Sequence, residues 1–423
     1  MTIRAQTPLS SSTSIYRLAC LLVVGNAACT VSPPPEAAIH ADPGRPLPGL
    51  SALHVARFDE GARVFARQFS PDEGLGPRFN ENACSACHTF PTDGGTGETS
   101  VRRISRTLED GRCDLLPEYS GSNLRIQVTP AFAASGGRPE RDLSRGTHTA
   151  IFTIPFIYGA GLLEGIPESV LRTLEDPDDS DRDGISGRLG HDPAGRPARF
   201  GRKGDIATLD DFVDSAFRQE MGLTTHVTPD ERAAGLVPGI VPHSSSGSTP
   251  HMASVDPAEE PEVSEDAFEA VVDYLRFLAP LSPRPVTSPE EIEGQRLFDS
   301  LGCAACHVPS LPTMVPTSVT DHLADELGVA EVQPVVALYS DLLLHDMGAQ
   351  LEGTCGPDAT TREYRTEPLM GLRWRKSFLH DGRAGRVMDA ILAHGGEAEG
   401  ARTRFEALNR LQQESLLKFL ATL

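Results

Sequence analysis

The chain has 423 residues, of which 39% are hydrophobic and 23% are charged. This length suffices for two folded domains, and the hydrophobic share excludes a protein that lies in a membrane throughout. The formal net charge of -21 argues against nucleic acid as a partner, because affinity for phosphates comes from Lys and Arg.

Residues 1–28 are expected to form a signal peptide. Arg4 and Arg17 precede an apolar run at residues 18–24 that is too short to span a bilayer. Cys29 follows two alanines and resembles a bacterial lipoprotein cleavage site, although Asn26 departs from that pattern. We therefore expect an exported, periplasmic protein, either anchored to the membrane by lipid or released by plain cleavage.

Residues 29–48 are rich in proline and are expected to form an extended tether. The folded part of the chain should then start near Gly49.

Two related units are predicted after the tether, at residues 49–283 and 284–423. Each opens with E-G-x-x-x-F, at Glu60 and at Glu293, and the ending LRFLAPL at residues 275–281 is echoed by LKFLATL at residues 417–423. Two short repeats in the same order favour duplication, although helix periodicity alone can produce such similarities.

The second unit opens with a helix start, because Ser288 can cap a helix with Pro289 at its first position and Glu291 three residues after the cap. Ile292, Leu297 and Phe298 should face inward. The closing helix carries leucines at helical spacing up to residue 423. We expect a mainly α-helical fold, with the first unit enlarged by loops and short strands between residues 110 and 261.

The strongest motif is Cys-x-x-Cys-His, which occurs as CSACH (Cys84, Cys87, His88) and as CAACH (Cys303, Cys306, His307). Two thiols at this spacing can each form a thioether to a haem vinyl group, and the adjacent His is then the proximal iron ligand. A thioredoxin-like pair would need a βαβ pattern, and zinc would need two pairs close together. Neither context is present, so the motif predicts two haem c groups, one in an N-terminal haem c domain and one in a C-terminal cytochrome c domain.

Two further features allow alternatives. Cys113 and Cys355 either form a disulfide between the two units or remain two buried thiols. Asp179, Asp181 and Asp183 alternate before Gly184 as in calcium loops, but no Glu stands at the twelfth position, so a solvated acidic turn is the alternative.

The sequence after residue 50 resembles the di-haem oxidoreductases, sometimes labelled thiol oxidoreductases, which are similar to bacterial di-haem cytochrome c peroxidases. The resemblance is carried by GLGPRFNENACSACH, GAGLLEGIPE, DDSDRDGISGR and RFGRKG in the first unit and by YSDLLLHDMG, YRTEPLMGL, FLHDGRA and AILAHGGEA in the second. It implies two cytochrome c-like domains, electron transfer between their haems, and calcium between the domains. Nothing in the residues supports the thiol oxidoreductase label.

The resemblance also implies iron ligands. The helix after the HDG turn supplies the sixth ligand of one haem in the peroxidase relatives, and His394 occupies that position here; the alternative is a His stabilised by the end of its helix. His148 lies roughly where the relatives place a distal His for the first haem, and Met221 is a second candidate. If neither binds, the first iron has an open position, and Glu164 would be an acid or base for cleaving the O–O bond, unless it merely stabilises a helix start.

Several other residues are expected to have structural roles. His380 should orient its loop. His345 and Met347 are rivals of His394 for iron ligation, but His345 is expected to be a satisfied buried histidine. Trp374 should pack or stack against a neighbouring arginine rather than carry electrons.

Two functions are consistent with these features. The first is a peroxidase that reduces hydrogen peroxide with electrons from a small redox protein, a cytochrome or cupredoxin, through the second haem. The second is an electron-transfer protein in which both irons are six-coordinate, and ligation by His148 would favour it.

Overall fold

The structure is a computed structural model that describes residues 33–116, 123–141, 143–229, 256 and 258–423. The predicted signal peptide and Cys29 lie outside the described residues. Among the residues that are described, no helix is both long and apolar enough to cross a membrane. Contacts divide the chain into residues 1–34 and a compact unit of residues 35–423, to which every helix and strand belongs.

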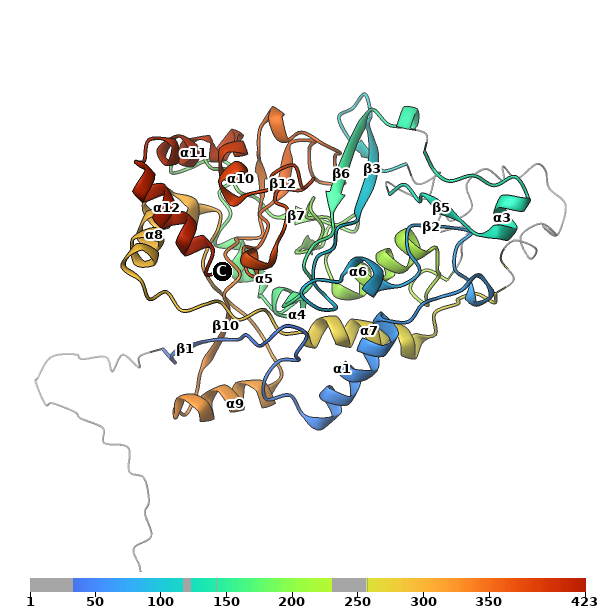
Figure 1. Ribbon diagram of the computed structural model, residues 1–423, viewed down its shortest axis with the longest axis horizontal. Coiled ribbons are helices and arrows are strands. Elements are labelled where there is room, and N and C mark those ends of the chain that lie inside the picture. Colours follow the sequence, from blue (N-terminus) through green and yellow to red (C-terminus); the bar gives the residue numbers. More distant parts are fainter. Residues whose placement is uncertain (1–32, 117–122, 142, 230–255, 257) are drawn as a thin grey trace, which may run out of the picture. The chain divides into compact units, whose positions relative to one another are not determined.

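Helices provide most of the regular structure, as Figure 1 shows. The α-helices are α1 Ala52–Phe65, α2 Cys84–Cys87, α3 Pro130–Ala134, α4 Ala160–Glu164, α5 Glu168–Arg172, α6 Leu209–Ala216, α7 Glu265–Phe277, α8 Pro289–Ser300, α9 Thr317–Leu327, α10 Val387–Ala393, α11 Glu399–Glu406 and α12 Arg410–Leu420. The strands are β1 Glu36–Ala38, β2 Arg78–Phe79, β3 Ser100–Thr107, β4 Cys113–Asp114, β5 Gln127–Val128, β6 His148–Thr153, β7 Gly190–His191, β8 Pro197–Ala198, β9 Leu311–Pro312, β10 Gln333–Val336, β11 Leu344–Asp346 and β12 Glu363–Arg365.

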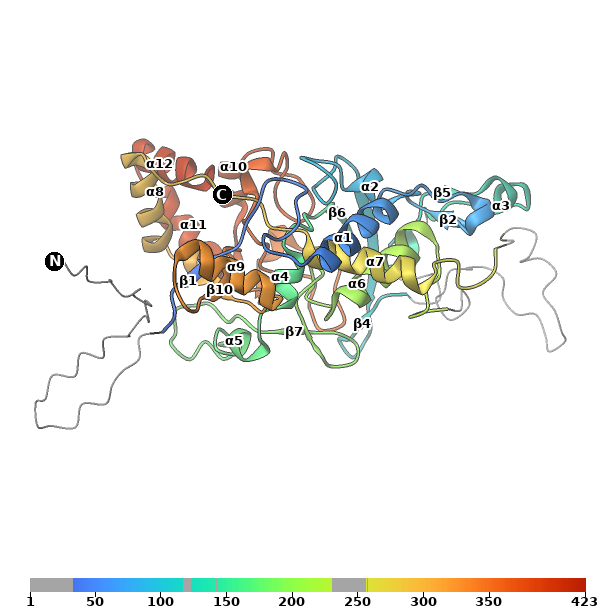
Figure 2. The ribbon, with the colours of Figure 1, turned by 90° about the horizontal axis from the view of Figure 1, so that it is seen from below.

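Two helix pairs repeat the same packing: α1 lies against α7, and α8 lies against α12 (Figures 1 and 2). The glycine of each E-G-x-x-x-F repeat is the point of closest approach. A Cβ atom on Gly61 would lie 1.9 Å from the carbonyl oxygen of Ala270, and one on Gly294 would lie 2.1 Å from that of Ser415. Only glycine permits the two backbones to approach this closely.

The repeated endings, however, are not matched in space as they are in sequence. When LRFLAPL is aligned with LKFLATL, the residues just before them, Tyr274 and Leu416, correspond. In the structure Tyr274 corresponds to Phe419 instead, because these two residues lie beside Gly61 and Gly294. Tyr274 packs on Phe65 at 5.0 Å between ring centroids, and Phe419 packs on Phe298 at 5.6 Å. The sequence echo is therefore displaced by almost one helical turn from the structural equivalence.

The helix start predicted at Ser288 is confirmed. Ser288 and Glu291 form a capping box, and Pro289 is the first residue of α8. Leu297 and Phe298 are buried, but the prediction for Ile292 is wrong, because its side chain is 56% exposed. It lies on the outer face of a helix that buries only one side.

The short strands predicted for the first unit are present. β3 is the central strand of an antiparallel sheet with β4 and β6, and β2 pairs with β5. Cys113 in β4 forms a disulfide with Cys355, which lies 242 residues further along the chain. The disulfide therefore joins the two predicted units.

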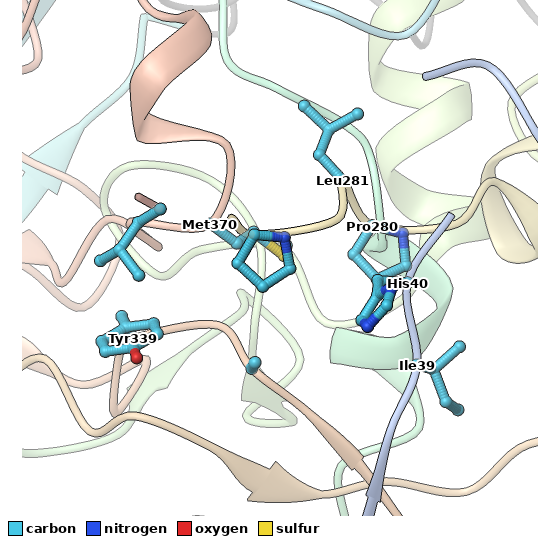
Figure 3. A pocket seen from close by; sticks show the side chains of 9 residues that line it. Ile39, His40, Pro280, Leu281, Tyr339 and Met370 are labelled. Atoms are coloured by element: carbon cyan, nitrogen blue, oxygen red, sulfur yellow. The ribbon is translucent and has the colours of Figure 1, made fainter. Parts of the chain in front are cut away.

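The proline-rich segment differs from the prediction of an extended tether. β1 pairs in parallel with β10, and Ile39 and Leu47 are buried in the main core. Figure 3 shows Ile39 and His40 beside Pro280 and Leu281 at a small pocket of about 20 Å³. A pocket of this volume has room for about one water molecule. Apolar residues between the prolines thus attach residues 35–48 to the folded unit.

Candidate functional site

The two Cys-x-x-Cys-His segments share one local backbone geometry. The amide of His88 donates to the carbonyl oxygen of Cys84 at 3.1 Å, and the amide of His307 donates to that of Cys303 at 2.9 Å. The first segment forms α2, and the second begins with the 3-10 helix η5, Cys303–Ala305. One tight turn in each segment thus sets both thiols and the imidazole relative to one another.

The four motif cysteines are free rather than paired in disulfides, and each is partly buried. Burial raises the pKa of Cys84 to about 12 and that of Cys303 to about 11. A dithiol that exchanges disulfides needs a thiolate near neutral pH, hence a lowered pKa. These thiols are therefore poorly suited to thiol–disulfide exchange.

Three buried imidazoles are held in the same protonation state. The Nδ1 atom of His88 lies 3.0 Å from the carbonyl oxygen of Gly95, and that of His307 lies 3.0 Å from the carbonyl oxygen of Tyr339. The Nδ1 atom of His394 lies 2.7 Å from the carbonyl oxygen of Ala390. A carbonyl oxygen only accepts, so Nδ1 carries the proton and Nε2 presents its lone pair, as in metal-binding histidines. Burial lowers the pKa of all three groups, to about 4 for His307, and keeps them neutral.

His307 and His394 line the same cavity of about 450 Å³, together with Cys303 and Cys306. His394 follows the last residue of α10, and its charge acts on His307 to lower the pKa of that group further. The other walls are largely apolar and include Phe298, as is usual for a cofactor site. The structure therefore brings the predicted second-site residues together.

His345 and Met347 also line this cavity. Nε2 of His345 lies 2.9 Å from a carboxylate oxygen of Asp341, and Nδ1 lies 2.7 Å from one of Glu397. Burial acts to lower the pKa of His345, but its hydrogen bonds outweigh burial and raise the pKa to about 12. His345 is thus an imidazolium between two carboxylates, and neither nitrogen is available to iron.

The first site contains an acid that sequence reasoning missed. Glu220 lies in the π-helix η4, Phe217–Met221, and is buried next to Cys87. Its two oxygens accept from Asn80 Nδ2 at 2.7 Å and from Asn123 Nδ2 at 2.6 Å. Burial raises the pKa of Glu220, and burial together with the charge of Glu220 raises the pKa of Cys87 to about 11. In the sequence, the one sign of a place for Glu220 at the first site was its position next to the ligand candidate Met221.

The structure does not bring His148 to the first site. Its Nε2 is 3.0 Å from Thr107 Oγ1. The backbone near His88 is that of Gly95 and Pro155. His148 and Thr153 are the first and last residues of β6, so at roughly 3.3 Å per residue they lie about 17 Å apart. Thr153 is the end near His88, because Pro155 follows it by two positions.

The other first-site candidates have structural partners. Glu164 accepts from the amide of Leu209 at 2.8 Å and from Arg276 Nε at 3.1 Å, so it supports the start of α6. Met221 is buried in the main core. In the region before α6, the acidic loop brings together Asp176, Asp179 and Asp181. Asp183 instead accepts from the amide of Ile185 and lines the second cavity.

His380 and Trp374 have the positions expected of structural groups. The ring of His380 stacks on that of Tyr364 at 4.4 Å, and its carbonyl oxygen accepts from the amide of Thr153. Trp374 has the guanidinium of Arg373 over its ring at 5.4 Å and contacts Phe90 edge-on at 6.0 Å.

A helical protein with two Cys-x-x-Cys-His turns and buried, neutral imidazoles belongs to the class that binds two haems. The family model described as "Di-haem oxidoreductase, putative peroxidase" matches residues 140–423, and the chain belongs to this family. The family therefore implies two haems, and the residues fit them: the second cavity is large and apolar, and its histidines present Nε2.

Comparison with solved structures gives distant similarities. The diheme peroxidase BthA of Burkholderia thailandensis is 17% identical, with 92% of this chain and 89% of that chain covered and a TM-score of 0.39. Hydrazine synthase of Kuenenia stuttgartiensis is 13% identical over 95% of this chain and 99% of that chain, with a TM-score of 0.37. A MauG-like protein associated with microbial copper homeostasis is 15% identical over 94% of each chain, with a TM-score of 0.34. No curated protein matches the chain.

Proposed function

We propose that the protein is a c-type di-haem peroxidase that reduces hydrogen peroxide with electrons from a small redox protein, a cytochrome or a cupredoxin. The supporting observation is the asymmetry of the two sites. His307 shares its cavity with His394, whereas the neighbours of His88 are the Phe65 ring and the backbone of Gly95 and Pro155. Two imidazoles suit electron transfer, and a single imidazole leaves a position for a substrate.

Cys84, Cys87, Cys303 and Cys306 would hold the two haems covalently. Each thiol would add across a vinyl group, forming a sulfur–carbon bond while its proton passes to the other vinyl carbon. The raised pKa of all four thiols disfavours competing disulfide exchange. His88, His307 and His394 would provide the axial nitrogens.

Bound haem supplies the one-electron chemistry for peroxide. Reduction of one H₂O₂ to two water molecules consumes two electrons and two protons, so the first site needs a group that holds a proton near neutral pH. Burial raises the pKa of Glu220, which is the direction that general acid–base catalysis requires. Asn80 and Asn123 fix the orientation of its carboxylate. We propose Glu220, rather than Glu164, as this proton-holding group.

The alternative function, an electron carrier with both irons six-coordinate, needs a sixth ligand at the first site. His148 was the candidate, and its hydrogen bond to Thr107 at the far end of β6 supports the peroxidase instead.

Low-temperature electron paramagnetic resonance of the purified protein tests the proposal. We expect one high-spin ferric signal from the first site, which cyanide converts to low spin, and one low-spin signal from the pair of His307 and His394. Steady-state peroxide consumption with a reduced cytochrome or cupredoxin should accompany it. Two low-spin signals with no response to cyanide or peroxide would contradict the proposal and favour the carrier.

Export to the periplasm, lipid attachment at Cys29 and calcium binding near Asp179 and Asp181 remain proposals from the sequence. Mass spectrometry of the processed protein would test the first two, and calcium titration would test the third.

A further inference from the structure

The charged side chains among the largely apolar walls of the second cavity are mostly cations, in contrast to the chain as a whole. The lining groups include the cations Arg202, Arg365, Arg375, Arg402, Arg404 and His345 and the anions Asp183, Glu367 and Glu397. The cavity thus has an excess of positive charge, while the chain carries a formal net charge of -21. A cavity of this kind favours a ligand with negative groups.

Three of these arginines surround a single carboxylate. Arg375 Nη1 lies 2.9 Å from Glu367 Oε1, and Arg365 Nη2 and Arg202 Nη1 lie 3.3 and 3.4 Å from Glu367 Oε2. The side chains of the three arginines are only 8 to 12% exposed. Burial acts to raise the pKa of Glu367, but the three guanidinium groups outweigh it and bring the pKa to about 2.

Three cations around one hydrogen-bonded anion leave the cluster with an excess of positive charge. Backbone carbonyl oxygens of Thr153 and Gly201 accept hydrogen bonds from Arg202 and Arg365, which satisfies N–H groups but does not neutralise charge. Arg375 Nε is buried and has no hydrogen-bond partner. Asp205 and Asp341 also act on Arg365, while Arg103 and Lys203 act in turn on Asp205. Buried charge that is only partly compensated is costly, so this cluster is suited to a ligand with negative groups.

The cluster and the thiols line the same cavity. The charges that act on Cys303 and Cys306 belong to Arg404, Asp299, His345, Asp341 and Glu397, and none of these is an arginine of the cluster, although Asp341 also acts on Arg365. The vinyl groups and the propionate groups of a haem occupy opposite edges of its ring. A haem joined to Cys303 and Cys306 would therefore direct its propionates toward the other end of the cavity.

We propose that Arg202, Arg365 and Arg375 bind the two propionates of the haem at the second site, an inference that rests on the proposed function. Guanidinium and carboxylate form strong charge-assisted hydrogen bonds, and Arg375 Nε–H is available for one. Arg202 follows β8 in the first predicted unit, whereas Arg365 and Arg375 belong to the second. The propionates would thus join the two units through one ligand.

The experiment uses the haem-loaded Arg365→Gln, Arg375→Gln double variant, each single variant and Arg375→Lys. Intact mass should show two haems in all of them, because the thioethers are unchanged. The reduction equilibrium constant of the low-spin haem should fall at least tenfold in the double variant, which corresponds to about 59 mV for one electron. Its potential should also become dependent on pH between 6 and 8, since a propionate without its cation protonates there.

Arg410→Gln is the matched control, because Arg410 is 90% exposed and pairs only with Glu414 on α12; its potential should equal that of the wild type. Arg375→Lys keeps the charge and should retain most of the potential that Arg375→Gln loses. If the double variant does not fold, the single variants decide the question. Two haems with unchanged potentials in the Gln variants would overturn the propionate site alone, whereas a wild-type protein without two haems would overturn the proposed function.

Discussion

The segments Cys84–His88 and Cys303–His307 have the same backbone turn but different surroundings. Acids act on the first, since Glu220 and Glu81 both raise the pKa of Cys87 beyond the effect of burial. The second lies in a cavity with an excess of cations and a second imidazole, His394. A five-residue turn would therefore define where a haem is attached, while residues far along the chain would define what that haem can do.

The largest expected effect concerns the acid of the first site. Glu220→Gln should lower the rate of peroxide reduction by about 100-fold or more, the usual contribution of a general acid or base. The fold should survive, because the buried Asn123 Oδ1 has no partner and can accept from the new amide after a flip of the Asn123 side chain. The measurement is steady-state turnover, with two haems confirmed by mass.

Glu81→Gln is the control for that variant, because Glu81 also acts on Cys87 but is not held by two amides. Its rate should remain within about twofold of the wild type, as expected for a group with no role in proton transfer. Equal losses in both variants would show that charge near Cys87, rather than proton transfer by Glu220, governs the rate.

A second prediction tests whether the two helix pairs are equivalent. Gly61→Ala and Gly294→Ala should each lower the free energy of unfolding by about 1–3 kcal/mol, because each new methyl group meets a backbone oxygen. Chemical denaturation measures the effect. Gly400→Ala in α11 is the control, since its nearest neighbour is the flexible Arg404 side chain at 3.4 Å. A loss at only one of the two glycines would break the equivalence.

A third prediction separates the two haems. His394→Met should raise the reduction potential of the second haem by at least about 59 mV, tenfold in the equilibrium constant, because Met ligation favours reduced iron. The high-spin signal of the first site should not change. A redox titration followed by absorbance gives the potential, and a shift at the first haem instead would reverse the assignment of the sites.

The smallest effect concerns pH and the second site alone. Burial acts to lower the pKa of His345, but Asp341, Cys306 and Glu397 outweigh it and raise the pKa to about 12, so the folded protein keeps this proton above the ordinary pKa of histidine. The stabilisation is complete below about pH 6.5 and is lost as pH rises toward the folded pKa, by at most about 1.4 kcal/mol per pH unit. Denaturation midpoints at pH 7, 8 and 9 should fall in the wild type and fall less in His345→Gln. Parallel slopes would argue against an imidazolium at this position.

The local features could be predicted from the sequence. Both Cys-x-x-Cys-His turns, the capping box at Ser288 and the disulfide alternative for Cys113 and Cys355 depend on spacing within a few residues or on a simple count of cysteines. The repeated E-G-x-x-x-F predicted two related units, and in the structure the glycine of each repeat lies at the contact of one helix pair. His394 was placed by its distance from the HDG turn, and it does line the cavity of His307.

Tertiary structure decided the remainder, because burial and charge balance arise from segments that are distant in the chain. In the sequence Glu220 is not distinguished from other acids, and only the structure shows that Asn80 and Asn123 hold its carboxylate. His148 is a ligand candidate in the sequence, and only the structure shows that β6 places it away from His88. The same holds for the three arginines around Glu367, which come from both predicted units. A sequence states which groups are near in the chain, and only folding brings together the groups that share a site.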